Sequence, residues 1–483
     1  MSAAAKEEKA SAWEMVVGLE VHVQLRTASK AFCACSTQFG NAPNANTCPV
    51  CLALPGALPV LNARAVELAA RAAIALGCTV HTRSVFARKN YFYPDLPKGY
   101  QISQADRPLA TDGHVTLADG SAIGVTRVHM EEDAGKSVHD RYVGMTAIDL
   151  NRAGVPLIEI VGEPEIRSAA QAGEYLRAIK EILVFAEVSD CSMEEGSLRV
   201  DANVSARPRG DAEFRPRTEI KNLNSFSNVQ RALELEFARH VATYEAGGGI
   251  AQQTMLFDAE TGEVRAARSK EGSHDYRYFP EPDLPPLVLE AAWLEAQRAA
   301  LPELPAARRA RFVASFALSA KEVEALTAER ALADYFEATA AAAKDGKLAA
   351  NWVLGEVLAA INADGGTLAE FSVTPVRLAA LIQLVKEGGV SSTAAKTLFQ
   401  TLRTDRAEPR AIAERDGLLL VGDDSALTGW IDEVFAEHPD EAARYAGGES
   451  RLQGVLVGLV MKKSKGRADP KKVNQLLSAR AGT

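Results

Sequence analysis

Residues 16–25, VVGLEVHVQL, contain the pattern that decides the class of fold. Apolar side chains occupy every second position of this segment: Val17, Leu19, Val21, Val23 and Leu25. A period of two is typical of a β-strand with one buried face, because successive side chains of a strand point to opposite sides. Glu20 and His22 then share the other face, so the segment predicts a strand that presents a carboxylate beside an imidazole.

Two further segments predict strands that carry acidic groups. SLRVDANVS, residues 197–205, alternates in the same way and places Asp201 opposite its apolar residues. PLIEIVGEP, residues 156–164, sets Glu159 inside an otherwise apolar strand, where an unpaired carboxylate would be costly to bury. For each strand alone, a solvent-exposed polar face is the simpler interpretation. Together, acids on several strands with one histidine favour a metal-binding sheet.

HMEEDAGKS, residues 129–137, ends like a phosphate-binding loop, but Met130 stands where the first glycine of such a loop belongs. Three consecutive acids, Glu131, Glu132 and Asp133, would repel bare phosphates. The same carboxylates can hold Mg²⁺, which in turn binds the phosphates of ATP. A solvated acidic turn is the alternative interpretation.

Residues 87–104, ARKNYFYPDLPKGYQISQ, combine four aromatic rings with basic residues and two prolines. Neither strand alternation nor a helical stripe is present, so the segment predicts an ordered loop. Flat rings such as Tyr91 and Tyr93 beside a fixed cation such as Lys89 suit a nucleotide. The alternative is an aromatic loop that packs on its own domain.

Residues 32–51, FCACSTQFGNAPNANTCPVC, hold four cysteines in two close pairs: Cys33, Cys35, Cys48 and Cys51. A C-x-C and a C-x-x-C pair can converge as four thiolates around one tetrahedral ion, and zinc is the natural occupant. Four sulfur ligands leave no open position, so the site should be structural. Disulfides are the alternative, which a reducing cytoplasm disfavours. Cys78 and Cys191 stand alone and are expected to be buried.

The composition is that of an ordinary globular protein, since 47% of the 483 residues are hydrophobic and 24% are charged. This length predicts two to four domains. The net charge of −9, from 54 basic and 63 acidic residues, argues against a polyanion-binding surface over the whole molecule, so any nucleic-acid contact should be a local patch. The start MSAAAKEEKA is charged, and no apolar run is long enough to cross a bilayer. A cytoplasmic enzyme without membrane contact is therefore expected.

The chain changes character near Leu289. Before it, short strand-like runs alternate with turns and a few clear helices, one over residues 61–77 with Asn62 as N-cap and one opening at Ser168. After it, the sequence is rich in Ala, Leu, Glu and Arg, which predicts an α+β body followed by helices. Residues 278–288, YFPEPDLPPLV, carry four prolines and predict an extended connector between the two parts.

Seven motifs, in order, resemble the B-subunit family of the tRNA-dependent amidotransferases over nearly the whole chain: GLEVHVQL, RKNYFYPDLPKGYQISQ, HMEEDAGKS, DLNRAGVPLIEIV, MEEGSLRVDANVS, EIKNLNSF and DYRYFPEPDLPPL. The resemblance implies one component of a glutamine-hydrolysing aminoacyl-tRNA amidotransferase, a carbon–nitrogen ligase. Such a component uses ATP to phosphorylate the side-chain carboxylate of misacylated Asp-tRNA(Asn) or Glu-tRNA(Gln), and ammonia then displaces the phosphate. It also implies an α+β fold, with an antiparallel-sheet catalytic body of the glutamine-synthetase-like kinase type, an all-α helical domain and an α-helical C-terminal tail.

The same resemblance implies the site residues. It implies a Mg²⁺ site of five side chains: Glu20, His22, Glu132, Glu159 and Asp201. Lys89 would lie near the transferred phosphoryl group, so Lys89, Glu132 and His22 are the candidate catalytic residues. Lys89, Tyr91 and Tyr93 are the candidate ATP contacts. Phosphoryl transfer to a carboxylate agrees with this set, because it needs cations over charged oxygens more than a general base.

Partners and domains are implied as well. Members of the family work in a heterotrimer with an amidase (glutaminase) and a small third subunit, and the aspartyl- or glutamyl-tRNA synthetase is a further candidate partner. The expected domains are a catalytic cradle with the zinc knuckle (1–290), a helical linker domain (291–406) and a tRNA-binding tail (407–483). Six basic residues gather in that tail: Lys462, Lys463, Lys465, Arg467, Lys471 and Lys472.

The end of the tail has clear helix signals. One apolar helix is expected to end near Gly466, and another to begin at Pro470 with Asp469 as its N-cap.

Two rival functions stay open from the sequence. A non-catalytic, zinc-stabilised tRNA-binding protein would gain nothing from carboxylates near phosphate. A metal-dependent hydrolase would turn over without ATP. Nucleotide hydrolysis measured with and without aminoacyl-tRNA separates these rivals from the amidotransferase.

Overall fold

The computed structural model describes residues 12–267 and 275–480, so the charged start at residues 1–10 lies outside the described residues. The chain divides into two compact units, Met1–Pro305 and Ala306–Thr483. The finer domain limits expected from the sequence, after residues 290 and 406, stay predictions.

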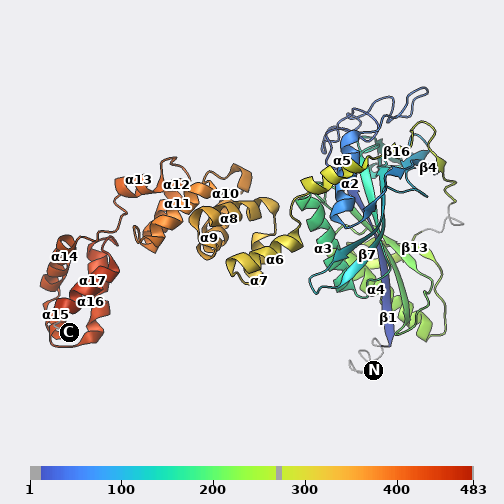
Figure 1. The fold of residues 1–483 in the computed structure, drawn as a ribbon. Coiled ribbons are helices and arrows are strands. Elements are labelled where there is room, and N and C mark those ends of the chain that lie inside the picture. The colour runs from blue at the N-terminus through green and yellow to red at the C-terminus, as the bar shows by residue number, and fades with distance from the viewer. Residues whose placement is uncertain (1–11, 268–274, 481–483) are drawn as a thin grey trace. The chain divides into compact units, whose positions relative to one another are not determined.

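One large sheet organises the first unit (Figure 1). Within residues 12–267 it has nine strands, in the spatial order β14 (Glu263–Ala266), β13 (Gln253–Asp258), β12 (Thr218–Lys221), β11 (Leu198–Pro208), β1 (Trp13–Gln24), β10 (Pro156–Gly162), β7 (Ala122–Glu132), β6 (Ala110–Thr116) and β2 (Thr79–Val80). Neighbouring strands are antiparallel except β12 and β13, which run parallel. Helix α4 (Phe226–Glu245) lies in the connection between these two strands, as a parallel pair requires a long crossover. The expected α+β body on a mostly antiparallel sheet is confirmed.

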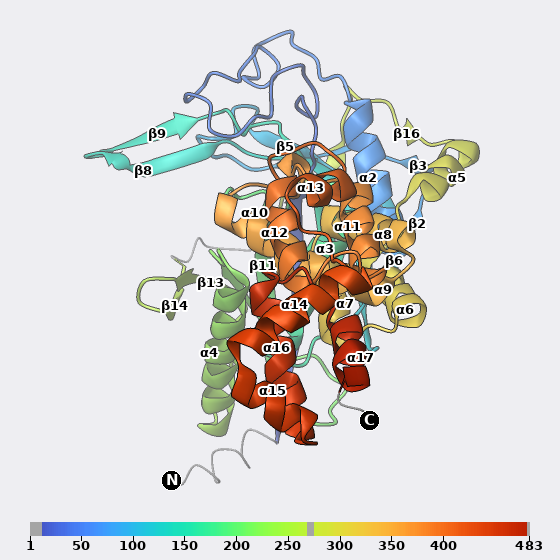
Figure 2. The same ribbon diagram turned by 90° about the vertical axis from the view of Figure 1, so that its left-hand side faces the viewer.

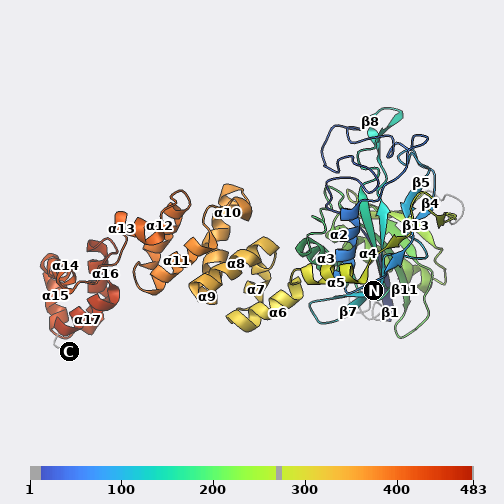
Figure 3. The same cartoon turned by 45° about the horizontal axis from the view of Figure 1, so that its top comes forward.

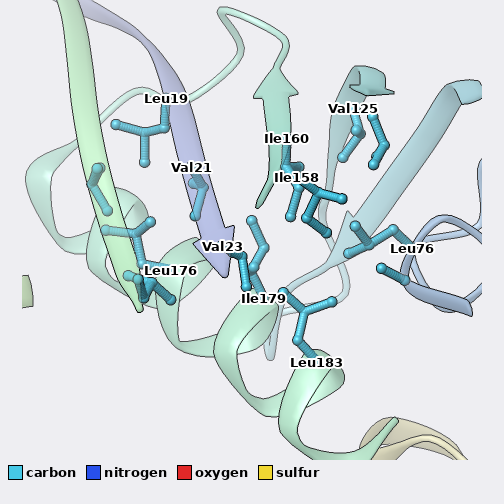
Figure 4. Close-up of a cluster of buried hydrophobic side chains, with 14 of the residues drawn as sticks. Leu19, Val21, Val23, Leu76, Val125, Ile158, Ile160, Leu176, Ile179 and Leu183 are labelled. Atoms are coloured by element: carbon cyan, nitrogen blue, oxygen red, sulfur yellow. The ribbon is translucent and has the colours of Figure 1, made fainter. Parts of the chain in front are cut away.

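The alternation predicted for β1 is confirmed, and it divides the sheet into two faces. Figure 4 shows the fully buried side chains of one face: Leu19, Val21 and Val23 from β1, opposite Leu176, Ile179 and Leu183 from helix α3 (Ala169–Phe185). Each such side chain contributes roughly 1.5–3 kcal/mol on burial. Glu20 and His22 lie on the other face and are partly exposed. One face is therefore the core, and the other is free to carry polar groups.

Helices of the first unit begin where the sequence predicts them. Helix α2 (Ala63–Ala75) follows Asn62, whose side chain accepts two backbone N–H groups, and α3 follows Ser168, whose hydroxyl caps the first turn. Gly77, with a φ of 68°, ends α2 in a backbone conformation that glycine adopts without strain. Both predicted helices are confirmed. Helix α5 (Ala291–Ala300) also belongs to this unit, and its Leu294 joins the core of the large sheet.

Among the described residues, seven short strands lie outside the large sheet: β3 (Arg83–Ser84), β4 (Ala87–Asn90), β5 (Tyr100–Ser103), β8 (Lys136–Tyr142), β9 (Met145–Asp149), β15 (Phe279–Pro280) and β16 (Leu287–Val288). β4 pairs with β5 and β15, β3 pairs with β16, and β8 pairs with β9 in the hairpin that projects in Figure 2. The predicted loop at residues 87–104 is wrong at both ends, because β4 and β5 are paired strands around a shorter loop. The connector predicted at residues 278–288 is extended but belongs to the body, because β15 and β16 complete these small sheets.

Helices make up the second unit (Figure 3). In chain order the α-helices are α6 (Pro305–Phe316), α7 (Ala320–Leu326), α8 (Arg330–Ala343), α9 (Gly346–Trp352), α10 (Leu358–Asp364), α11 (Pro375–Lys386), α12 (Ser392–Leu402), α13 (Pro409–Arg415), α14 (Asp424–Glu437), α15 (Pro439–Ala446), α16 (Gln453–Lys463) and α17 (Pro470–Arg480). A π-helical turn, Val353–Val357, joins α9 to α10, and 3-10 turns occur at Leu368–Glu370 and Ser450–Leu452. The expected helical character of this part is confirmed.

The second unit contains two hydrophobic clusters, one within residues 312–413 and one within residues 427–477. The helix signals near the end are confirmed: α16 ends shortly before Gly466, which has a φ of 79°, and α17 begins at Pro470. The Asp469 carboxylate accepts a backbone N–H of the first turn of α17 at 2.9 Å. None of the helices described here combines the length and the apolar character that crossing a bilayer requires.

Candidate active site

Four neighbouring strands place polar side chains in one row across the large sheet. His22 on β1 is directly opposite Arg199 on β11 and Glu159 on β10. Glu159 is in turn opposite His129 on β7. Because directly opposed residues point to the same side of a sheet, these four side chains share the polar face. His22 and Glu159 are predicted metal residues, whereas Arg199 and His129 are not in the predicted set.

Three side chains of this face come close enough to hold one cation. The ligand atoms of His22, Glu131 and Glu159 all lie within 4.8 Å of one another. His22 Nε2 is 3.2 Å from Glu159 Oε2, and His129 Nε2 is 3.0 Å from Glu131 Oε1. Two carboxylates with one imidazole suit a divalent cation, and the carboxylate oxygens are typical ligands of Mg²⁺ or Mn²⁺. These donors therefore fit the metal that the family resemblance implies. We refer to His22, Glu131 and Glu159 as the carboxylate cluster.

The charges of the carboxylate cluster shift its pKa values in opposite directions. Burial disfavours the charged form of His22, but the hydrogen bond and the charge of Glu159 outweigh it and raise the pKa of the imidazole. Burial also acts to raise the pKa of Glu159, yet the hydrogen bond from His22 and the charge of His129 lower it. The shifts favour an imidazolium–carboxylate pair, whose proton a divalent cation would replace.

Glu131 is held firmly within the polar face. Its carboxylate accepts hydrogen bonds from Gln101 Nε2 at 2.9 Å and from Ser103 Oγ at 2.7 Å, both on β5. Burial alone would raise the pKa of Glu131, but the hydrogen bond and charge of His129 and the charge of Lys89 lower it far below its ordinary value. Glu131 is therefore ionised and oriented by its neighbours, as a metal ligand is in a preorganised site.

Lys89 lies beside the carboxylate cluster. It is on β4, and its ammonium is 5.1 Å from the centre of the Tyr276 ring. Burial opposes its charge, but the carboxylates of Glu131 and Glu159 outweigh burial and raise the pKa of Lys89. The residue predicted to contact a phosphoryl group is thus a cation next to the acids.

Glu20 and Asp201 occupy the next position along the strands. They face each other across β1 and β11, and neither belongs to the carboxylate cluster. Burial and then the nearby carboxylates, led by Glu159, raise the pKa of Glu20. Asp201 is instead paired with Lys221 Nζ at 2.7 Å. Both acids extend the negative face without joining the three clustered ligands.

Glu132, a predicted ligand, also lies outside the carboxylate cluster. Its carboxylate accepts the backbone N–H of Ile102 at 2.9 Å and is paired with Lys98 Nζ. Glu132, Ile102 and Lys98 line a cavity whose wall also includes two of the cysteines. Among the acids of residues 131–133, Glu131 is the one whose carboxylate lies close to His22 and Glu159.

Strand alternation explains why Glu131 rather than Glu132 reaches the polar face. On β7, Val128 and Met130 belong to the hydrophobic core. His129 and Glu131 therefore point to the opposite side. The sequence VHMEE contained this signal, because its apolar members already alternate with His129 and Glu131.

The loop between β4 and β5 carries the other predicted ATP contacts. The Tyr91 ring lies edge-on to those of Tyr93 and Tyr276, with centroids 6.2 and 6.1 Å apart. Its hydroxyl donates to Gln101 Oε1 at 3.3 Å, so Tyr91 is tied to the residue that also holds Glu131. The Tyr93 side chain is half exposed. Contact of these two rings with ATP stays a prediction.

A cavity of 980 Å³ opens beside the polar face. It is lined by four basic residues, Lys136, Arg152, Arg199 and Lys221, and by four acidic residues, Asp149, Glu194, Glu195 and Asp201. Gln24 and Asp201 also contribute to its wall, so the cavity adjoins the row of polar side chains. Cations, carboxylates and carboxamides such as Asn222 in one wall suit a polar substrate that is rich in hydrogen-bonding groups.

The four predicted zinc ligands converge in loops that precede α2. The sulfur atoms of Cys33, Cys35, Cys48 and Cys51 lie within 4.8 Å of one another. Cys51 Sγ is 3.8 Å from Cys48 Sγ and 4.0 Å from Cys35 Sγ. Sulfurs bound tetrahedrally at 2.3 Å from one zinc ion are about 3.8 Å apart, so these residues fit zinc. We call this segment, residues 33–51, the cysteine knuckle.

The other two cysteines are buried, as predicted. Cys78 is 3% exposed and Cys191 is 0% exposed. All six cysteines are free thiols in the structure, which disagrees with the disulfide alternative.

Two family models match the chain: the GatB/GatE catalytic domain over residues 15–295 and the GatB domain over residues 334–480. The chain belongs to the B-subunit family of the aspartyl/glutamyl-tRNA(Asn/Gln) amidotransferases. The predicted family is thereby confirmed, and with it the enzyme class, a carbon–nitrogen ligase of the glutamine-hydrolysing amidotransferase type. The polar face and the cysteine knuckle both lie within the match to the catalytic domain.

Individual members of this family resemble the chain over nearly their whole length. It is 51% identical to the B subunit of the aspartyl/glutamyl-tRNA(Asn/Gln) amidotransferase of Chlorobium luteolum over 469 residues, which cover 96% of this chain and 98% of that protein. The same protein of Solidesulfovibrio magneticus is 51% identical over 473 residues, with coverage of 97% and 99%. That of Geobacter sulfurreducens is 51% identical over 471 residues, with coverage of 96% and 98%.

Proposed function

We propose that the chain uses ATP to activate the side-chain carboxylate of misacylated Asp-tRNA(Asn) or Glu-tRNA(Gln). A carboxylate oxygen attacks the γ-phosphorus, ADP leaves, and an acyl phosphate forms. Ammonia then attacks the acyl carbon, phosphate leaves, and loss of a proton gives Asn-tRNA(Asn) or Gln-tRNA(Gln). The observation that carries this proposal is the convergence of His22, Glu131 and Glu159 beside a polar cavity whose wall includes Arg199.

The polar face supplies the groups that phosphoryl transfer requires. His22, Glu131 and Glu159 would hold Mg²⁺, which neutralises charge on the phosphates when bound. Lys89 is the candidate contact for the transferred phosphoryl group, because the charges of Glu131 and Glu159 already act on its ammonium and raise its pKa. Arg199, ion-paired with Asp133 at 2.9 Å, is fixed in the cavity wall, where it can orient a substrate carboxylate.

The predicted acids outside the carboxylate cluster have secondary roles in this proposal. Glu20 and Asp201 flank the metal ligands on the same face and would act on the cation through water. Glu132, which is paired with Lys98, is not proposed as a direct ligand.

Hydrolysis of glutamine is assigned to a separate protein of the complex. Burial first, and nearby acids to a smaller extent, raise the pKa of the Cys78 and Cys191 thiols to about 12, so neither is a ready nucleophile. The other four cysteines are gathered in the cysteine knuckle. The relatives are named as one subunit of an amidotransferase, which supports a complex. We propose the heterotrimer with an amidase (glutaminase) and a small third subunit.

The tail is proposed to bind the body of the tRNA. Lys462, Lys465 and Lys471 are exposed, and none of them forms an ion pair with another described residue. Lys463, in contrast, is paired with Glu437 at 2.6 Å. Unpaired lysines can replace the counterions of phosphate without losing an internal partner, which makes them the better RNA contacts.

Three finer expectations accompany this function. The mostly antiparallel sheet supports the glutamine-synthetase-like kinase class for the body. Association with an aspartyl- or glutamyl-tRNA synthetase and a cytoplasmic location stay predictions.

The experiment follows ADP and amide formation by the complete complex, with ammonium chloride in place of glutamine. We expect ADP to form with Mg²⁺ and misacylated tRNA, in equal amount to the amide. A non-catalytic tRNA-binding protein would produce no ADP. A metal-dependent hydrolase would act without ATP, so either result would reject the proposal.

A further inference from the structure

Lys30 is a fully buried lysine that the proposed chemistry does not use. Its side chain is 0% exposed, and its ammonium donates to the carbonyl oxygens of Asn46 at 2.7 Å and Leu150 at 3.2 Å. Asn46 lies between the two cysteine pairs, and Leu150 directly follows β9. No carboxylate of the described residues forms an ion pair with Lys30. A buried charge without an ion-pair partner is costly, so a further negative charge nearby would stabilise it.

A zinc-bound cysteine knuckle would supply that charge. Four thiolates with one Zn²⁺ carry a net charge of about −2. Lys30 lines the same 180 Å³ cavity as the ligands Cys33 and Cys51. The backbone N–H of Lys30 also donates to the carbonyl oxygen of Cys35 at 3.0 Å. Lys30 therefore brings a positive charge into the wall of the cysteine knuckle.

The turn at Gly154 brings the same lysine next to the acidic segment, residues 131–133. A carbon atom at the Cβ position of Gly154 would lie 3.5 Å from Lys30 Cδ, 3.8 Å from Glu132 Oε2 and 3.9 Å from Cys51 Cβ. The three side chains thus surround one point. The φ of Gly154 is 86°, so this turn needs a residue that tolerates the left-handed region.

Backbone hydrogen bonds complete the link between the cysteine knuckle and the acids. The N–H of Ala31 donates to Gly154 O, and the N–H of Gly154 donates to Asp133 O, both at 2.8 Å. The chain next to the knuckle is therefore bonded through one residue to the segment that carries Glu131.

We propose that Lys30 is a positioning residue that couples the metal of the cysteine knuckle to the acidic segment. Its ammonium balances the charge of the metal–thiolate cluster, and its bond to Leu150 fixes the turn that is bonded to Asp133, two residues after Glu131. Occupancy of the knuckle then sets the geometry of the acids, beyond the purely structural role expected from four sulfur ligands. The effect on activity rests on the proposed function, whereas the effects on zinc retention and on backbone protection do not.

The test compares three variants of the chain in the complete complex. Lys30→Met keeps the apolar stem and removes the charge, Lys30→Arg keeps the charge, and Leu68→Ala truncates a fully buried side chain of α2 as a control for general destabilisation. We expect Zn²⁺ to pass to a colour-forming chelator at least about tenfold faster from Lys30→Met than from the wild type, since outer partners of metal sites have effects of this size. The rate of zinc release from Lys30→Arg should lie between the rates of the wild type and Lys30→Met. The rate from Leu68→Ala should match that of the wild type. Normal zinc release from Lys30→Met would overturn the proposal.

Amide hydrogen exchange, measured without substrate, tests the coupling itself. Exchange at residues 131–133 and 150–155 should be faster in Lys30→Met and in zinc-stripped wild type, and stripping zinc from Lys30→Met should add little. Additive effects of the mutation and of zinc removal would overturn the proposal. If Lys30→Met does not fold, Gly154→Ala takes its place, because it perturbs the same turn. It is expected to show faster zinc release and faster exchange as well. Normal zinc release and exchange in Gly154→Ala would then overturn the proposal. If the wild type makes no ADP, the proposed function fails, yet zinc release and exchange still decide the role of Lys30.

Discussion

The cysteine knuckle and the carboxylate cluster are two candidate cation sites built in opposite ways. The knuckle takes its ligands from residues 33–51, in a stretch between β1 and α2 where the structure describes no helix or strand. The carboxylate cluster takes its ligands from β1, β7 and β10, whose register is set by the large sheet. Glu131 and Glu159 already have side-chain partners outside the cluster or within it, whereas the sulfurs of the knuckle contact one another and the backbone of Cys48. A site on strands can hold its shape before a cation binds, but a site on loops depends on its ion.

Removing the ion from the cysteine knuckle should have the largest effect on stability. The purified chain is expected to contain about one zinc, and Cys48→Ser with Cys51→Ser should abolish it. The free energy of unfolding of the first unit should then fall by on the order of 5 kcal/mol, less than zinc supplies to an isolated zinc finger, because the sheet core persists. Elemental analysis and denaturant unfolding measure the two quantities. Zinc-free wild type prepared under reducing conditions would contradict the expectation.

Breaking the carboxylate cluster should affect chemistry rather than stability. Glu131→Gln and His22→Ala are each expected to slow ADP formation at least about 100-fold, which is about 2.7 kcal/mol of transition-state stabilisation. The free energy of unfolding should change by less than about 2 kcal/mol, because the sheet still holds the remaining side chains. Glu132→Gln is the matched control and should be slowed less, since that side chain lies outside the cluster. Equal losses in Glu131→Gln and Glu132→Gln would restore Glu132 as a ligand.

Glu236 is a buried acid outside both candidate cation sites, and side chains of the protein supply its hydrogen bonds. Glu236 on α4 is 0% exposed and accepts hydrogen bonds from Thr218 at 2.8 Å and Arg239 at 2.6 Å. Burial alone would raise its pKa, but the bonds from His240, Arg239 and Thr218 lower the pKa of Glu236 to about 2. A lowered pKa stabilises the fold at pH values above 4.5, the ordinary pKa of a glutamate. This stability is lost as the pH falls toward 2.

Glu236→Gln should therefore lower the free energy of unfolding by on the order of 2 kcal/mol at pH 7 and by about half as much at pH 3, because pH 3 still lies above the folded-state pKa of about 2. Urea unfolding of the wild type and the variant at both pH values measures this difference. A cost that is the same at pH 7 and pH 3 would show that the charge of Glu236 contributes nothing.

The smallest expected effects concern single lysines of the tail. Lys462→Gln and Lys465→Gln should each weaken tRNA binding a few-fold and reduce the log–log salt slope by about 0.7–0.9. Lys463→Gln should change the slope less, because its charge is already paired with Glu433 and Glu437. Binding titrations at several salt concentrations measure the slopes. Equal slopes for the paired and the unpaired lysines would show that the internal ion pairs do not matter for RNA binding.

Local patterns predicted most of the elements that depend only on neighbouring residues. The spacing of four cysteines predicted a cluster that the structure forms, and Asn62 and Ser168 predicted the first turns of α2 and α3. The strand β1 followed from an alternation of ten residues. Each of these features is fixed within a short segment, so its signal survives in the sequence alone.

Features that depend on distant pairing were missed. Arg199 and His129 join the polar row only through the register of strands far apart in the chain. The strands β4 and β5 were hidden by aromatic residues and by the prolines of the loop between them, and β15 and β16 looked like a connector until their partners were known. Alternation along β7 places Glu131, rather than Glu132, on the side of the other clustered ligand atoms, and a metal contact of Glu132 stays a prediction.

The burial of two cysteines makes the chain its own sensor of metal loss. Cys78 and Cys191 are 3% and 0% exposed, so every sulfur that a maleimide can reach in the folded chain belongs to the cysteine knuckle. Bound zinc would mask the sulfurs of the cysteine knuckle from alkylation. Departure of the ion would unmask the partly exposed Cys33, Cys35 and Cys48 together, whereas Cys51 is itself buried. The number of labelled positions in a mass spectrum would therefore report the fraction of molecules without zinc, with no added probe and no mutation.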